Sequence, residues 1–140
     1  MGRILGLDVG DKTIGMAVSD ELKWTAQAAG SIRRAGKKTD FPAIINFAQE
    51  NQVEEIVIGL PKNMDNSLGE QAKKVLTFSR RLQGRLGADV KVTLWDERLS
   101  SSAAEKTLIA ANVTRKKRKH VIDTMAAVLI LQGYLDSLSP

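Results

Sequence analysis

Three consecutive segments decide the fold: RILGLDV at 3–9, GDKT at 10–13 and IGMAVS at 14–19. The outer two are rich in β-forming residues, and the middle one has the composition of a hairpin turn. We therefore predict two antiparallel strands, Arg3–Val9 and Ile14–Ser19. The first carries a carboxylate, Asp8, close to its end. Aspartate is unfavourable there unless it starts a turn, pairs with a cation or binds a metal.

The remaining elements alternate between strands and helices. We expect three further strands, over Ala26–Arg33, Val53–Leu60 and Val90–Trp95. One helix is expected after a cap at Thr39-Asp40, a second from a Ser67–Glu70 capping box to about Gly87, and a third from a Ser102–Glu105 capping box to about Ala111. A last helix is expected over about His120–Leu135. Antiparallel strands followed by alternating strands and helices predict an α/β fold with a mixed sheet and helices on its faces. We expect one domain over residues 1–140.

Composition narrows the possible chemistry. The 140 residues are 43% hydrophobic, which is enough for a real core, and they include no cysteine and one histidine. Disulfides, zinc–thiolate sites and iron–sulfur clusters are thereby excluded, and oxygen-liganded ions such as Mg²⁺ or Mn²⁺ remain. The longest apolar run, Met125–Leu131, is far shorter than the roughly 20 residues of a membrane span. We expect no membrane association and a cytoplasmic location.

The charge distribution favours an anionic partner. Lysine and arginine number 21 against 16 acids, for a net charge of +5. Five consecutive basic residues, Arg115–Lys119, form one cluster, and Arg33-Arg34 with Lys37-Lys38 form another. A basic run is typical of phosphate binding, although a single run is also typical of a solvated loop.

Two further acids end a predicted strand. Asp96 and Glu97 follow Val90–Trp95, and because side chains alternate along a strand, only one of them can share a face with Asp8. The other caps the next segment or pairs with Arg98. The spacing alone does not choose between them.

A fourth acid lies on the packed face of the last predicted helix. Asp123 is at helical spacing from Ala126, Ala127 and Ile130, which are small or apolar. A first-turn acid favoured by the helix dipole is the alternative, but it does not explain a position on the packed face. Acids that converge from three distant segments repel one another unless a divalent cation neutralises them. The pattern predicts a metal site suited to phosphodiester cleavage.

Five motifs extend along nearly the whole chain: Gly6–Gly10 with Lys12 and Gly15, Ala17–Asp20, Gly59–Asp65, Trp95–Ser100, and Asp123 with Ala126-Ala127 and Ile130-Leu131. Together they resemble the bacterial YqgF-type family, described as Holliday junction resolvases and as pre-16S rRNA processing nucleases. One small departure is Ser101, where the family often has threonine. The resemblance implies an RNase H-like fold with a five-stranded sheet, and a catalytic, metal-binding triad of Asp8, Glu97 and Asp123. It is this resemblance that selects Glu97 over Asp96.

We expect the protein to be a divalent-metal-dependent endonuclease that acts on structured nucleic acid. The substrate we favour is pre-16S rRNA, processed at its 5′ end. A Holliday junction resolvase acting on DNA and a non-catalytic RNA-binding ribosome-assembly factor are the alternatives. A sugar-kinase or actin-like ATPase is disfavoured, because those folds use two such halves. The residues expected to contact phosphates are Lys12, Lys62, Asn63, Arg115, Lys116, Lys117, Arg118, Lys119 and His120. Helix capping, a solvated loop and an ordinary turn lysine are their alternative roles, and both a monomer and a homodimer remain possible.

Overall fold

The computed structural model describes residues 2–99 and 115–138, and among these the side chains of residues 99 and 115–123 are outside the description. The elements are β1 (Arg3–Val9), β2 (Thr13–Ser19), β3 (Ala26–Arg33), α1 (Lys37–Glu50), β4 (Val53–Leu60), α2 (Glu70–Leu86), β5 (Lys91–Asp96), the 3-10 turn η1 (Glu97–Leu99) and α4 (Arg115–Leu138). The helix predicted after Ser102 lies outside the described residues.

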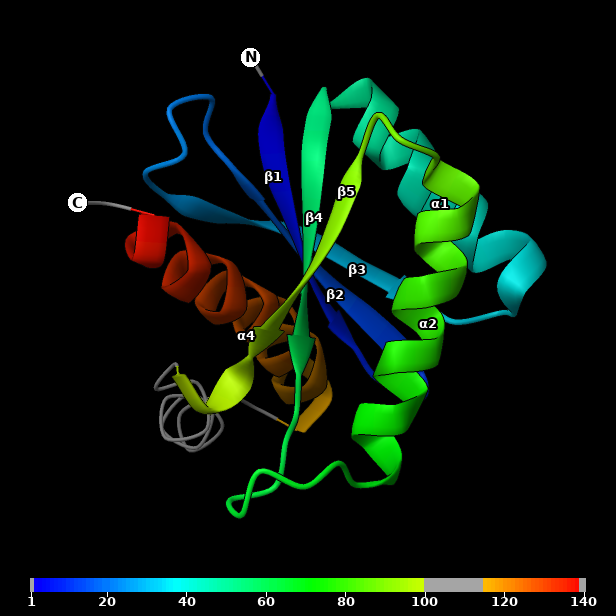
Figure 1. Cartoon of the computed structure of the whole chain (residues 1–140), viewed down its shortest axis with the longest axis vertical. Helices are drawn as coiled ribbons and strands as arrows, with labels where there is room; N and C mark the ends of the chain where they lie inside the picture. Colours follow the sequence, from blue (N-terminus) through cyan, green and yellow to red (C-terminus); the bar gives the residue numbers. More distant parts are fainter. Residues whose placement is uncertain (1, 100–114, 139–140) are drawn as a thin grey trace.

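The five strands form one mixed sheet in the order β3-β2-β1-β4-β5 (Figure 1). The β1–β2 and β2–β3 pairs are antiparallel, whereas β1–β4 and β4–β5 are parallel. The predicted mixed five-stranded sheet is confirmed. Because β1, β4 and β5 run in the same direction, their carboxyl ends meet at one edge of the sheet.

Alternation along β1 assigns its side chains to two cores. Leu5, Leu7 and Val9 belong to a buried cluster with side chains of α1 and α2, whereas Ile4 belongs to a second cluster with side chains of α4. Asp8 shares the face of Ile4 because residues two apart point the same way. The central strand therefore presents its only carboxylate on the α4 side of the sheet.

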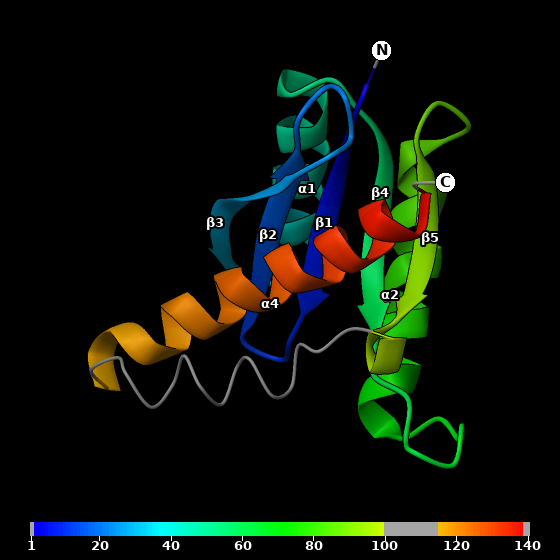
Figure 2. The same cartoon turned by 90° about the vertical axis from the view of Figure 1, so that its left-hand side faces the viewer.

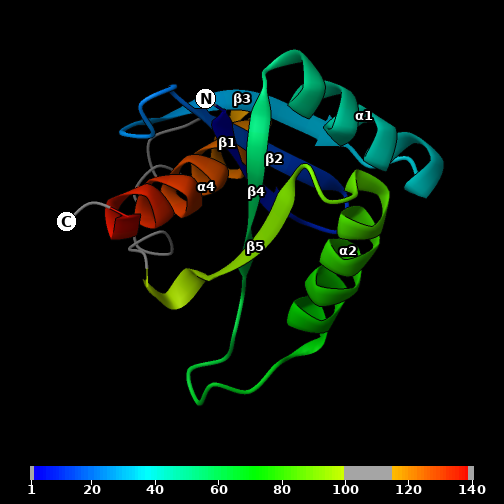
Figure 3. The same cartoon turned by 45° about the horizontal axis from the view of Figure 1, so that its top comes forward.

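Helices cover both faces of the sheet, as predicted. Helix α4 crosses one face (Figure 2), and α1 and α2 lie next to each other against the other face (Figure 3). The approach of α4 to β1 is very close, since a β-carbon added to Gly6 would lie 2.7 Å from Leu131 Cβ. None of the helices described is long and apolar enough to cross a bilayer.

The starts of α1 and α2 differ from the predicted caps. Helix α1 begins at Lys37 after Gly36, and the Asp40 carboxylate accepts a hydrogen bond from the Ala35 N–H at 3.0 Å, upstream of the helix. Helix α2 begins after Gly69 with no side-chain cap. Ser67, expected to cap it, instead donates its hydroxyl proton to Asp65 at 2.6 Å. Both predicted caps were wrong, because local side-chain bonds compete with the cap positions.

The start of α4 corrects a prediction that bears on function. The helix begins at Arg115 and not near His120, so the backbone of the basic run Arg115–Lys119 is helical. Lysine and arginine are good helix formers, so a run of them is compatible with a helical backbone. Asp123 consequently lies beyond the first turn, where the helix dipole has little influence.

Candidate active site at the carboxyl edge of the sheet

Asp8 is the penultimate residue of the central strand and is half-buried. Its register partner on β2 is Gly15, which has no side chain to fill the space beside the carboxylate. Parallel pairing on the other side brings the ends of β4 and β5 to the same edge. The location fits a functional carboxylate better than a turn-forming one, because Gly10 and Thr13 close the turn by a backbone hydrogen bond of 2.9 Å.

Glu97 meets Asp8 at this edge. Both acids line one cavity of about 290 Å³, together with residues from β1, the β1–β2 turn, β4 and α2. The other lining residues are Val9, Gly10, Asp11, Gly59, Pro61 and Gln71. Gln71 connects the start of α2 to the site by donating a hydrogen bond to the Val9 carbonyl at 3.1 Å.

Gly59 makes room for the Glu97 side chain. A β-carbon at residue 59 would lie 2.6 Å from Glu97 Oε1 and 2.5 Å from Ile130 Cδ1. Glu97 therefore packs directly on the backbone of β4, beside a buried residue of α4. The sequence places Gly59 within the predicted strand Val53–Leu60 and does not by itself reveal this role. A glycine interrupting the apolar β4 was the available signal, since such glycines often mark close backbone or side-chain approach.

Asp96 is engaged by Arg98 and does not line the cavity. The Arg98 guanidinium donates Nε to Oδ1 at 3.0 Å and Nη2 to Oδ2 at 2.6 Å, and its backbone N–H also donates to Oδ1. The hydrogen-bonded Arg98 guanidinium holds the pKa of Asp96 below its usual value, so this carboxylate stays ionised. The structure thus separates two acids that strand alternation left equivalent.

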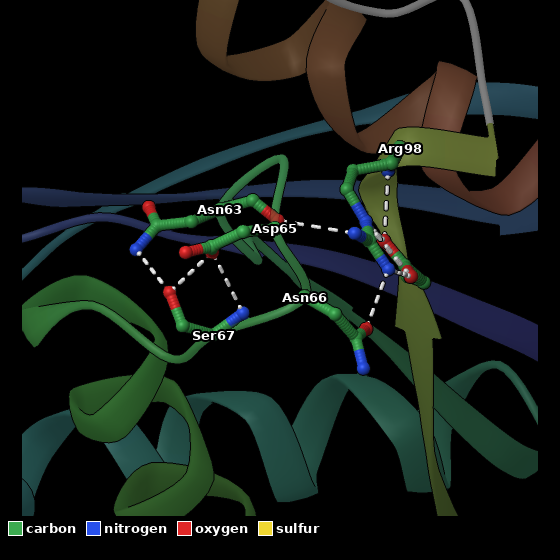
Figure 4. A network of polar contacts seen from close by, with 6 residues as sticks. Asn63, Asp65, Asn66, Ser67 and Arg98 are labelled. Atoms are coloured by element: carbon green, nitrogen blue, oxygen red, sulfur yellow. Dashed lines mark hydrogen bonds and ion pairs between the residues drawn. The ribbon is translucent and has the colours of Figure 1, made fainter.

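Arg98 also holds the loop between β4 and α2 against η1 (Figure 4). Its Nη1 donates to the Asn63 carbonyl at 3.0 Å, and its Nη2 donates to Asn66 Oδ1 at 2.8 Å. Inside the loop, Asn63 Nδ2 donates to Ser67 Oγ at 3.0 Å, and hydrogen bonds from Ser67 lower the pKa of Asp65. The loop that borders the cavity through Pro61 is therefore tied to the segment that carries Glu97.

The predicted phosphate contacts are only partly described. Lys12 is exposed in the β1–β2 turn, and Lys62 is half-buried in the β4–α2 loop. The Asn63 side chain is occupied within that loop, which favours a structural role for it. The side chains of the basic run Arg115–Lys119 and of His120 lie outside the description.

Asp123 is the third predicted ligand, and its side chain is also outside the description. Its helical neighbours Ala126, Ala127 and Ile130 are buried, as the pattern predicted. Among the side chains that the structure describes, no group of three or more histidines, aspartates or glutamates could hold a metal. Three described carboxylates line the cavity, Asp8, Glu97 and Asp11, and Asp11 is paired with Lys74 at 3.3 Å.

This donor set fits a hard divalent cation. Two carboxylates that share a cavity repel each other unless a proton or cation lies between them. Carboxylate oxygens are the ligands that Mg²⁺ and Mn²⁺ prefer. Gly59 leaves space that a side chain would otherwise fill beside Glu97.

Carboxylates at the carboxyl edge of a mixed five-stranded sheet, beneath a helix that crosses one face, define an RNase H-like nuclease. Residues 2–137 match the RuvX family, described as Holliday junction resolvase, and the chain belongs to that family. A relative from Clostridioides difficile (strain 630), named as a candidate pre-16S rRNA nuclease, is 56% identical over 135 residues, or 96% of this chain and 94% of its own. One of the same name from Halalkalibacterium halodurans is 55% identical over 136 residues, covering 96% of each chain.

Solved structures support the same fold. RuvC of T. thermophilus in complex with a Holliday junction substrate matches with a TM-score of 0.60 and 14% identity, over 98% of this chain and 96% of that one. The fowlpox virus resolvase in complex with Holliday junction DNA also matches with a TM-score of 0.60 and 14% identity, over 99% of each chain. The predicted RNase H-like fold and the resemblance to this family of nucleases are confirmed.

Proposed function

We propose that the protein is a divalent-metal-dependent endonuclease that trims pre-16S rRNA at its 5′ end. One observation carries the catalytic part of the proposal: Asp8 and Glu97, from segments far apart in sequence, line the same cavity at the carboxyl edge of the sheet. Carboxylates at such an edge can hold the divalent cation that assists phosphodiester hydrolysis. Processing of rRNA would place the protein in the cytoplasm.

Asp8, Glu97 and Asp123 are the residues that would hold the metal. A bound Mg²⁺ or Mn²⁺ would supply a water nucleophile and neutralise charge on the phosphate oxygens. The protein positions the Glu97 carboxylate: Gly59 leaves space for it against β4, and Arg98 holds the adjacent backbone through Asp96. Rigid support of this kind matters, because a misplacement of about 1 Å can cost about 100-fold in rate.

The basic residues bind the substrate in this proposal. Lys12, Lys62 and the run Arg115–Lys119 would contact phosphates without reading sequence, since lysine and arginine neutralise phosphate charge. His120 would contribute in the same way at the end of the run. Hydrolysis adds water to phosphorus and breaks the bond to the 3′ oxygen, which leaves as a hydroxyl. The products carry 3′-hydroxyl and 5′-phosphate ends.

The choice of RNA rests on the names of close relatives. Those compared above are about equally long and more than half identical, and both are named for pre-16S rRNA. A four-way DNA junction is the second candidate, favoured by the description of the family. A resolvase that cuts two strands of a junction symmetrically would be expected to act as a homodimer, whereas an rRNA nuclease can act as a monomer.

A side-by-side cleavage assay tests the proposal. Wild type and Asp8→Asn are incubated with a 5′-extended 16S rRNA fragment and with a four-way DNA junction, with and without Mg²⁺. We expect metal-dependent cleavage of the RNA by the wild type, and retained binding without cleavage by Asp8→Asn. Cleavage of the junction alone would favour the resolvase, and binding without cleavage by the wild type would favour the non-catalytic assembly factor.

A further inference from the structure

A second hollow lies between α1 and α2, on the face of the sheet opposite α4. Its volume is about 360 Å³, larger than that of the carboxylate cavity. We name it the α1–α2 groove; its lining residues come from the end of β3 and from both helices. They are Arg34, Lys37, Phe41, Glu70, Lys73, Lys74, Thr77, Phe78 and Arg81.

The charge of this groove is strongly one-sided. Five of its lining side chains are cationic, and Glu70 is its one carboxylate. Lys37, Lys73 and Arg81 are exposed and take part in none of the ion pairs found in the described part of the chain. Cations gathered in one hollow repel one another, and an anion entering it would relieve that repulsion.

Two aromatic rings form the apolar floor of the groove. The rings of Phe41 and Phe78 pack with centroids 5.0 Å apart and are almost completely buried. The Arg34 guanidinium lies 5.4 Å from the Phe78 ring centroid and is paired at 3.4 Å with the buried Asp40. Because the rings are buried, they cannot stack on bases, so the exposed groups that the groove offers a ligand are mainly cationic.

The α1–α2 groove shares a wall with the carboxylate cavity. Arg34 Nη1 donates to the Gly10 carbonyl at 2.8 Å, and Lys74 Nζ pairs with Asp11 at 3.3 Å. Gly10 and Asp11 both line the carboxylate cavity, and so does Gln71, the neighbour of Glu70 in the groove. A polyanion that occupies the cavity can therefore continue over the β1–β2 turn into the groove.

We propose that the α1–α2 groove binds backbone phosphates of the same nucleic acid, on the side of the scissile phosphate away from α4. The inference rests on the proposed nuclease function and extends it by a second substrate-binding surface. Contacts of this kind do not read base sequence, because they reach only the phosphates. The substrate would then be held on both sides of the cleavage site, which favours an extended or branched structure over a short oligonucleotide.

Two matched double variants test the groove. Lys73→Gln with Arg81→Gln removes two unpaired groove cations, and Arg80→Gln with Lys91→Gln removes one lysine and one arginine that do not line it. Binding to the RNA fragment is measured over a salt series. For the groove variant we expect the slope of log affinity against log salt to fall by about two units, one per lost contact. The control should keep the wild-type slope and the wild-type RNA concentration for half-maximal cleavage, whereas the groove variant should need a higher RNA concentration.

A gain-of-affinity variant makes the test independent of damage to folding. Glu70→Gln removes the single carboxylate from the lining and should tighten binding, whereas Glu50→Gln at the end of α1 should not.

If the wild type cleaves RNA but the groove and control variants share one salt slope, the inference is overturned while the proposed function stands. If the wild type neither binds nor cleaves nucleic acid, both proposals fail. If the groove variant loses affinity only for a free nucleotide such as ATP, the groove is a small-molecule site and the inference is overturned.

Discussion

Arg98 binds the carboxylate of Asp96 through two guanidinium nitrogens and its own backbone N–H. This pairing turns Asp96 toward η1 and the β4–α2 loop, and the next residue, Glu97, lines the cavity with Asp8. The two adjacent acids therefore differ in role: Asp96 helps to hold the β4–α2 loop through Arg98, and Glu97 lines the cavity.

The first prediction separates these two acids by substitution. Glu97→Gln should lower the cleavage rate by more than about 100-fold, because Glu97 is a proposed metal ligand and losing a ligand costs more than the 10–100-fold typical of a supporting partner. Asp96→Asn should cost only about tenfold, at the lower end of that range, since asparagine still accepts the Arg98 backbone N–H. Single-turnover cleavage of the same RNA measures both. Equal losses in the two variants would contradict the division of tasks.

The second prediction concerns the space beneath Glu97. Gly59→Ala should displace the Glu97 carboxylate or Ile130, destabilise the fold by roughly 1–3 kcal/mol and reduce cleavage. Gly84→Ala in α2 is the matched control, because a β-carbon there meets nothing within 4 Å. The control should stabilise the protein by about 0.5–1 kcal/mol and leave cleavage unchanged. Urea unfolding and the cleavage assay together test this pair, and a Gly59→Ala variant with wild-type stability would contradict the packing described.

The third prediction concerns the pH dependence of stability that Tyr134 of α4 causes. Burial, and then a hydrogen bond to Glu55, raise the pKa of Tyr134 from 10.0 to about 12. The phenol donates to Glu55 Oε2 at 2.6 Å, and Thr93 donates to the same oxygen. Because the folded protein holds the proton more tightly than the unfolded chain, this contribution to stability is complete below the unfolded pKa. It is lost as pH rises through the folded pKa.

Tyr134 is the only tyrosine of the chain, so its ionisation can be followed directly by ultraviolet absorbance. The native protein should titrate well above the urea-unfolded chain. Glu55→Gln should move the native pKa downward but not back to its ordinary value, since burial is the larger cause. Identical titrations of native and unfolded protein would contradict the hydrogen bond between Tyr134 and Glu55.

The fourth prediction concerns metal removal. A chelator should stop cleavage, and added Mg²⁺ or Mn²⁺ should restore it, because the carboxylates need a hard cation to act on a phosphate. Ca²⁺ should support binding with little cleavage, since its coordination is looser and more variable. Product ends are read by labelling, with 3′-hydroxyl and 5′-phosphate expected. Products ending in a 2′,3′-cyclic phosphate, or activity in excess chelator, would point to a different active site.

Much of the fold was predictable because local pattern and tertiary packing agree. The residues of the β1–β2 hairpin and of β4 predict these strands directly. The burial of Ala127 and Ile130 confirms the predicted packed face of the last helix. Helix starts were less predictable. The caps of α1 and α2 are glycines, and the serine expected to cap α2 forms hydrogen bonds within its own loop.

The candidate site was predictable in its residue types but not in its packing. Asp8 was predictable because burying a carboxylate near the end of a central strand costs free energy unless the carboxylate is paired or binds a metal. Strand alternation could not choose between Asp96 and Glu97, because the chain leaves the strand there and turns into η1. The contact between Gly59 and Glu97 joins a residue of β4 to one of η1, which are far apart in sequence, so no local pattern contains it. The role of Asp123 stays a prediction.

The most direct test of the metal site is a calorimetric titration of Mn²⁺ into the protein without nucleic acid. The wild type should bind the ion, Asp8→Asn, Glu97→Gln and Asp123→Asn should each weaken binding by more than about tenfold, and Asp96→Asn should weaken it less than any of these three. Mn²⁺ binding that is unchanged in all four variants would contradict the account.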